Sequence, residues 1–109
     1  MTDAQVVLTG SDLSVEQVAA VARAGASATF APPAVDRMQR SRAVIEKLVS
    51  EGAVVYGVTT GVGALADRRI PLEDAEKLQE NLLLSHAAGV GEALPREVVR
   101  AMLLLRANT

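Results

Sequence analysis

Proline and glycine divide this sequence into segments that could each form one helix or strand. Between these breaks, apolar residues recur every three or four positions, which is the spacing of one face of a helix. The breaks include prolines that suit a first helical turn and glycines that suit a helix end: Pro32, Pro33, Pro71 and Pro95, and Gly25, Gly52 and Gly89. We therefore expect a mainly α-helical domain with one or two short strands and a glycine-rich loop.

The apolar pattern places each expected element between these breaks. Ser14 and Gln17 have the spacing of a capping box, which predicts that a helix begins after Ser14. The β-branched, apolar run that ends at Gly10 favours a strand. The full prediction is a strand at 6–10, a helix over 15–24, an extended piece at 28–30, a helix from 32 to 52, a brief strand at 53–55, a loop over 56–63, a helix from 71 to about 89 and a last helix from 95 to 109.

Length and composition exclude several classes of protein. The chain has 109 residues, the size of one small domain, and its single histidine and lack of cysteine argue against a metal site. A net charge of −2 and 2% aromatic residues argue against nucleic-acid binding. The sequence has neither a membrane-spanning stretch nor a signal peptide, so we expect a cytoplasmic protein. Because no glycine cap closes the last apolar helix, residues 1–109 are interpreted as the N-terminal domain or fragment of something larger.

The glycine-rich loop contains three glycines within seven residues: Gly57, Gly61 and Gly63. Its backbone N–H groups could contact an anion, but a phosphate-binding P-loop needs a lysine and a serine or threonine after its last glycine. Ala64 and Leu65 stand there instead. The dinucleotide-binding glycine spacing is also absent. From the residues alone, a mobile connection is the simplest interpretation.

Tyr56 and His86 are the side chains that could carry chemistry. Tyr56 comes where a strand is expected to break into the loop, and ordinary packing would explain it. A tyrosine phenol is a poor base at neutral pH unless cations or hydrogen-bond donors stabilise its phenolate. His86 lies at the end of an apolar helical face, where it could be a hydrogen-bonded boundary residue or a ligand contact.

Three linked motifs carry a resemblance that goes further. They are Tyr56–Gly63 (YGVTTGVG), Leu78–Gly91 (LQENLLLSHAAGVG) and Arg106–Thr109 (RANT). In order and spacing they resemble the N-terminal segment of the aromatic amino acid ammonia-lyases and aminomutases, the superfamily that includes histidine ammonia-lyase. These enzymes use a 4-methylideneimidazol-5-one (MIO) cofactor.

The resemblance implies that the chain is a segment of a larger all-helical lyase. The complete enzyme would assemble as a homotetramer and remove ammonia from an L-amino acid. Tyr56 matches the loop tyrosine that takes the β-proton of the substrate. Gly57, Gly61 and Gly63 would then be the hinges of a loop that closes over the substrate. His86 matches the position that contacts the substrate ring, and Ser-His there is similar to histidine ammonia-lyases and to tyrosine aminomutases.

The sequence departs from the family pattern in three places. Val62 stands where the family usually has Phe or Tyr, and Thr59 resembles the phenylalanine and tyrosine enzymes rather than the histidine enzymes. The Ala-Ser-Gly tripeptide that cyclises to MIO is missing, since the nearest match is Ala26-Ser27-Ala28. We therefore expect the 109-residue chain alone to form no MIO and to be inactive. A tyrosine or phenylalanine lyase or aminomutase, and a non-catalytic interaction domain, stay open as alternatives.

Overall fold

The computed structural model describes residues 4–109, and these divide into two compact units. One unit joins the N-terminal segment up to Gln39 with residues 92–109, and the other comprises residues 40–91. The described elements are mainly helical, as predicted, with one two-stranded sheet.

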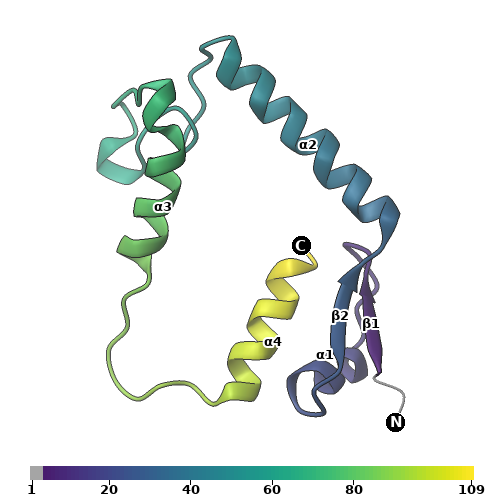
Figure 1. Ribbon diagram of the computed structural model, residues 1–109. Helices are drawn as coiled ribbons and strands as arrows, with labels where there is room; N and C mark the ends of the chain where they lie inside the picture. Colours follow the sequence, from purple (N-terminus) through teal and green to yellow (C-terminus); the bar gives the residue numbers. More distant parts are fainter. Residues whose placement is uncertain (1–3) are drawn as a thin grey trace. The chain divides into compact units, whose positions relative to one another are not determined.

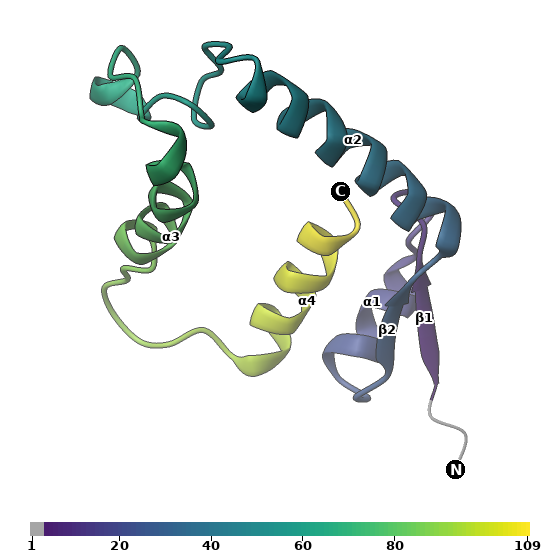
Figure 2. The same ribbon diagram turned by 45° about the horizontal axis from the view of Figure 1, so that its top comes forward.

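The sheet of the first unit is parallel. Strand β1 (Gln5–Leu8) pairs with β2 (Ser27–Phe30), with Gln5 opposite Ser27 and Leu8 opposite Phe30. Figures 1 and 2 both show the two strands side by side. Parallel strands need a crossover connection, and helix α1 (Val15–Ala22) provides it. The extended piece predicted at 28–30 is therefore the second strand of a β-α-β unit.

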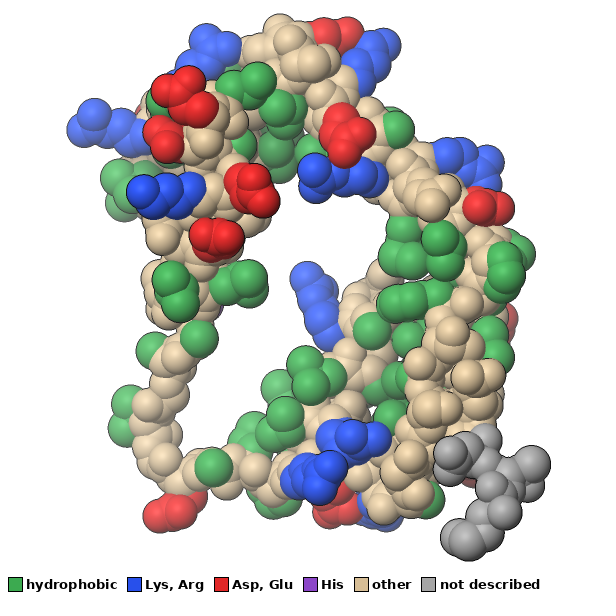
Figure 3. All heavy atoms as spheres, in the orientation of Figure 1, with side chains coloured by type: hydrophobic (Ala, Val, Ile, Leu, Met, Phe, Trp, Pro, Cys, Tyr) green, Lys and Arg blue, Asp and Glu red, His purple; other side chains and the backbone are tan. Residues whose placement is uncertain are grey.

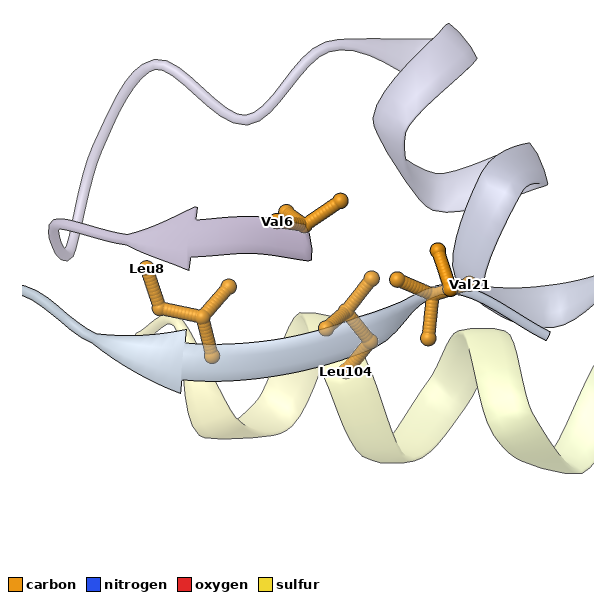
Figure 4. Packing of buried hydrophobic residues seen from close by; sticks show 5 residues of the cluster. Val6, Leu8, Val21 and Leu104 are labelled. Carbon is orange, nitrogen blue, oxygen red and sulfur yellow. The ribbon is translucent and has the colours of Figure 1, made fainter. Parts of the chain in front are cut away.

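The core of this unit is small and aliphatic. Val6, Leu8, Val21 and Leu104 converge from β1, α1 and helix α4 (Arg96–Ala107), as Figure 4 shows, and each is at most 6% exposed. The alternation of buried and exposed residues along β1 turns Val6 and Leu8 to the same face of the sheet. Leu104 therefore links the end of the chain to its first strand.

Helix α1 begins with the capping box predicted from the sequence. The Ser14 hydroxyl accepts the N–H of Gln17, and the Gln17 side chain accepts the N–H of Ser14. The pKa of the Glu16 carboxyl is lowered from its ordinary value by a hydrogen bond from its own backbone and by a second from the Ser14 side chain. The backbone N–H groups in these bonds are ones that a helix start otherwise leaves unpaired.

Helix α4 packs on α1 but leaves much of its own apolar surface uncovered. Figure 3 shows hydrophobic side chains on the surface along this helix, and Met102, Leu103 and Leu105 are each at least half exposed. The helix ends at Ala107, with Asn108 as its C-cap, rather than running to Thr109 as predicted. The Asn108 side chain accepts the N–H of Gly10, while its own backbone N–H still donates to the Leu104 carbonyl, so the cap joins the end of α4 to the turn after β1.

The second unit contains most of the long helix α2 (Pro32–Ser50), two short 3₁₀ helices (Gly63–Leu65 and Leu72–Asp74) and helix α3 (Ala75–His86). Helix α3 is shorter than predicted at both ends, because the turn after Pro71 is a 3₁₀ helix and the α-helix ends at His86. Within residues 4–109, no helix has the length and apolarity needed to cross a membrane.

The brief strand predicted at 53–55 is wrong. The Val55 N–H and the Ala53 carbonyl are both hydrogen-bonded to the Thr59 hydroxyl, at 2.8 and 2.7 Å, rather than to a neighbouring strand. Ala53 also donates its N–H to the Leu48 carbonyl, and Gly52 has a φ of 68°, as in a helix C-terminus closed by a left-handed glycine. Residues 53–55 thus follow the C-terminus of α2 and lead into a turn.

Candidate functional site

Tyr56 opens a loop that buried threonines hold in place. Thr59 and Thr60 are 4% and 3% exposed, although the loop lies near the surface. The Thr60 hydroxyl accepts the N–H of Gly57 at 3.2 Å and lies 2.9 Å from the Gly61 carbonyl. Side-chain oxygens therefore replace the regular backbone ladder that three glycines in seven residues cannot maintain.

The returning chain pairs with this loop. Gly61 donates its N–H to the Arg68 carbonyl at 3.0 Å, and Ile70 donates to the Thr59 carbonyl at 2.8 Å. These bonds form an isolated antiparallel bridge between Thr60 and Arg69. The bridge thus fixes the middle of the loop over 56–63, with Tyr56 and Gly57 before it and residues 61–68 enclosed beyond it.

The phenol of Tyr56 lies at the loop surface. The residue is 66% exposed, and its oxygen accepts the backbone N–H of Gly63 at 3.2 Å. This bond closes the loop from its first residue to its last. The phenol oxygen is therefore both held by the loop backbone and open to solvent.

The three glycines of the loop serve different steric needs. Gly57 and Gly63 have φ values of 71° and 57°, in the left-handed region that side chains disfavour. Gly61 has no such angle, but a Cβ atom there would lie 2.6 Å from the Leu65 carbonyl oxygen. Their role as hinges stays a prediction, and the structure shows that each of the three positions favours glycine.

A contact that the sequence analysis missed joins this loop to α3. The side-chain amide of Gln79 donates to the Gly57 carbonyl at 2.8 Å, across 22 residues of sequence. The motif that contains Gln79 was recognised, but its spacing says nothing about the loop that the side chain reaches. The tyrosine loop and α3 are therefore directly linked.

His86 is the last residue of α3, and its ring is held by the helix. Its Nδ1 lies 2.8 Å from the Leu82 carbonyl oxygen and 3.0 Å from the Ser85 hydroxyl. A carbonyl can only accept, so Nδ1 carries the hydrogen and the Nε2 of the neutral ring is an acceptor. His86 is exposed, which leaves Nε2 accessible to a donor on a ligand.

Tyr56 and His86 lie in the same unit, but within residues 4–109 no direct hydrogen bond joins them. Their connection runs through Gln79 and α3. A shallow pocket of about 330 Å³ in this unit lies beside Thr59 and Arg69 and contains neither residue in its lining. Among the described residues, no group of His, Asp and Glu side chains could hold a metal ion.

Ala26-Ser27-Ala28 does not fit an MIO group. Ser27 is the first residue of β2, and its N–H donates to the Ala4 carbonyl at 3.0 Å, while the N–H of Ala26 donates to the Ala20 carbonyl. Cyclisation would disrupt this pairing, and the third residue is alanine where the tripeptide requires glycine. The segment is a structural part of the sheet.

The described part of the chain is mainly helical, and the comparison with known families gives its class. The model of the family described as "Aromatic amino acid lyase" matches residues 13–109. The chain belongs to this family.

Relatives and solved structures within the family are similar over nearly the whole chain. Histidine ammonia-lyase from Gloeobacter violaceus is 52% identical over 103 residues, which cover 94% of this chain and 20% of that protein. The crystal structure of histidine ammonia-lyase from Trypanosoma cruzi superimposes with a TM-score of 0.82 at 40% identity, over 95% of this chain and 20% of that one. Tyrosine aminomutase from Streptomyces globisporus gives a TM-score of 0.89 at 33% identity, with the same two coverages. The chain thus spans about a fifth of the length of the proteins it matches.

Proposed function

We propose that residues 1–109 are the N-terminal part of a histidine ammonia-lyase-like enzyme that eliminates ammonia from an L-amino acid to give an α,β-unsaturated acid. Family membership and 52% identity to a histidine ammonia-lyase support the reaction class. The observation that carries the proposal is the loop in which the exposed phenol of Tyr56 accepts the N–H of Gly63.

In this proposal Tyr56 takes the β-proton of the substrate. The glycine-rich loop presents the phenol oxygen to solvent, where a substrate can reach it, and the Gly63 N–H holds that oxygen in place. Gly57, Gly61 and Gly63 let the loop close over the bound amino acid. The proton acceptor and its hydrogen-bond donor thus belong to the same loop.

In this proposal His86 contacts the ring of the substrate. Its Nδ1–H is committed to the Leu82 carbonyl, so Nε2 can accept a hydrogen bond from an imidazole N–H or a phenol O–H. A phenyl ring has no donor to offer. This chemistry favours histidine or tyrosine over phenylalanine, and the similarity to histidine ammonia-lyases favours histidine.

The rest of the catalytic apparatus lies outside these residues. The sequence contains no Ala-Ser-Gly, so an MIO in the complete enzyme forms from a segment beyond residues 1–109. MIO supplies an electrophile for the substrate amine. We further propose that the complete enzyme is a cytoplasmic homo-oligomer, as the family resemblance implies.

Two alternatives have support of their own. Similarity to a tyrosine aminomutase favours 2,3-migration of the amine, which would yield a β-amino acid instead of free ammonia. The uncovered apolar side chains of α4 favour a non-catalytic interaction domain. Product analysis separates the first alternative from the lyase, and complete lack of turnover by a full-length protein would favour the second.

The experiment is a substrate comparison in the full-length protein, with and without His86→Phe. We expect ammonia release from L-histidine or L-tyrosine in preference to L-phenylalanine. His86→Phe should shift the ratio of kcat/KM values towards phenylalanine by about 5- to 150-fold, because an unpaired polar group against an apolar ring costs about 1–3 kcal/mol.

A ratio that stays within about twofold of the native value, together with lower thermal stability, would show that His86 is structural. Ser85→Ala is the matched control, since it removes the neighbouring hydroxyl and leaves the Nδ1 contact to Leu82 in place. This control should keep the native order of substrates.

A further inference from the structure

Gln79 makes a long-range contact to the tyrosine loop that the proposed function leaves unexplained. Its amide donates to the carbonyl of Gly57, the residue that directly follows Tyr56, at 2.8 Å. Gly57 has a φ of 71°, so the direction of its peptide groups sets how the chain turns away from Tyr56. A bond to this carbonyl therefore holds the peptide between Gly57 and Val58, one residue beyond the tyrosine.

Gln79 also shares a helix face with His86. Seven residues separate them on α3, which corresponds to almost two full turns, so both point to the same side at about 10 Å along the axis. One rigid element thus carries the residue that holds the tyrosine loop and the residue proposed to contact the substrate ring. The separation between the two is fixed by helix geometry.

We propose that Gln79 is a positioning residue, which tethers the tyrosine loop to α3 and thereby sets the phenol of Tyr56 at a defined distance from His86. The inference rests on the proposed function for its catalytic consequence, while the tether itself rests on the contact to Gly57 alone. Gln79 acts through the loop and touches no reacting atom.

The tether is weak enough to open during turnover. Gln79 is exposed, and water competes for both its amide and the Gly57 carbonyl, so the bond changes a local equilibrium by only about 2- to 12-fold. The bridge between Thr60 and Arg69 is independent of Gln79 and stays in place without it. Loss of the tether therefore loosens the chain around Tyr56 and Gly57, which precede the bridge, without unfolding the rest of the loop.

Hydrogen exchange of peptides that cover residues 56–63, in the full-length protein, tests the tether without reference to activity. Gln79→Met keeps the length and helix preference of the side chain and removes the donor. We expect exchange to become about 2- to 12-fold faster. Gln79→Lys keeps a donor and should exchange at the native rate, and Glu80→Gln, on the next residue of α3, should also leave the rate unchanged.

Unchanged exchange in Gln79→Met, or equal acceleration in Gln79→Met and Gln79→Lys, would overturn the proposal. Kinetics then test the catalytic consequence: Gln79→Met should lower kcat by a factor similar to the exchange effect, with KM less affected. If the full-length protein has no lyase activity, the proposed function fails, while the exchange result still decides whether Gln79 holds the loop.

Discussion

The Thr59 hydroxyl determines the conformation of the chain just before the tyrosine loop. It accepts the N–H of Val55 at 2.8 Å and donates to the Ala53 carbonyl at 2.7 Å, and the residue is only 4% exposed. The sequence marked this position as a departure from the histidine enzymes and hence as a clue to substrate. Within residues 4–109, the hydrogen bonds of the Thr59 side chain go to the backbone of Ala53 and Val55, just before the tyrosine loop.

Thr59→Val should loosen this segment, because valine has the shape of threonine but leaves a partly buried N–H and a partly buried carbonyl without the hydroxyl as a partner. That loss costs about 1–3 kcal/mol, which corresponds to hydrogen exchange about 5- to 150-fold faster over residues 53–60. Thr59→Ser keeps the hydroxyl and serves as the control. Equal exchange in the two variants would contradict the structural role of the hydroxyl.

Among the elements, the starts of α1 and α2 and the glycine that closes α2 were predicted correctly because local residues determine them. Pro32 begins α2, Ser14 caps α1 and Gly52 follows the end of α2 with a positive φ, each for a reason contained in a few adjacent residues. The predicted strand at 53–55 was wrong because the Val55 N–H and the Ala53 carbonyl are hydrogen-bonded to the Thr59 hydroxyl. Strand propensity does not report such bonds.

The parallel pairing of β1 with β2 and the Gln79 tether could not be read from the sequence. Pairing depends on how α1 folds back on the sheet, and the tether joins residues 22 positions apart. The candidate residues Tyr56 and His86 were found through motif resemblance. The carbonyl that fixes the His86 ring and the N–H that contacts the Tyr56 phenol became visible only in three dimensions.

For the molecule as a whole, the sequence produces little core. Within residues 4–109, the buried apolar cluster consists of five aliphatic residues, and several large apolar side chains of α3 and α4 are more than half exposed, among them Leu83, Leu84 and Leu103. Exposed apolar surface of this kind favours association. We therefore expect the 109-residue chain by itself to self-associate and to be catalytically silent.

Sedimentation of the purified chain, together with an ultraviolet assay for unsaturated acid products, checks this expectation. Oligomers should form at roughly tens of micromolar, and absorbance should stay at the blank value. A stable monomer at that concentration, or turnover of histidine, tyrosine or phenylalanine, would contradict it. Replacing Leu103 by a polar residue should reduce association, because Leu103 is 66% exposed on α4.

The most direct test of the account is Tyr56→Phe in the full-length enzyme, because it removes the phenol oxygen and keeps the ring. The Gly63 N–H loses its acceptor, but the hydrogen bonds of the Thr59 and Thr60 hydroxyls to the backbone remain. We predict that substrate binding persists and that kcat falls by about 10²–10⁴-fold, the usual loss for a general base. A fall in kcat of less than about tenfold, with binding intact, would contradict Tyr56 as the proton acceptor.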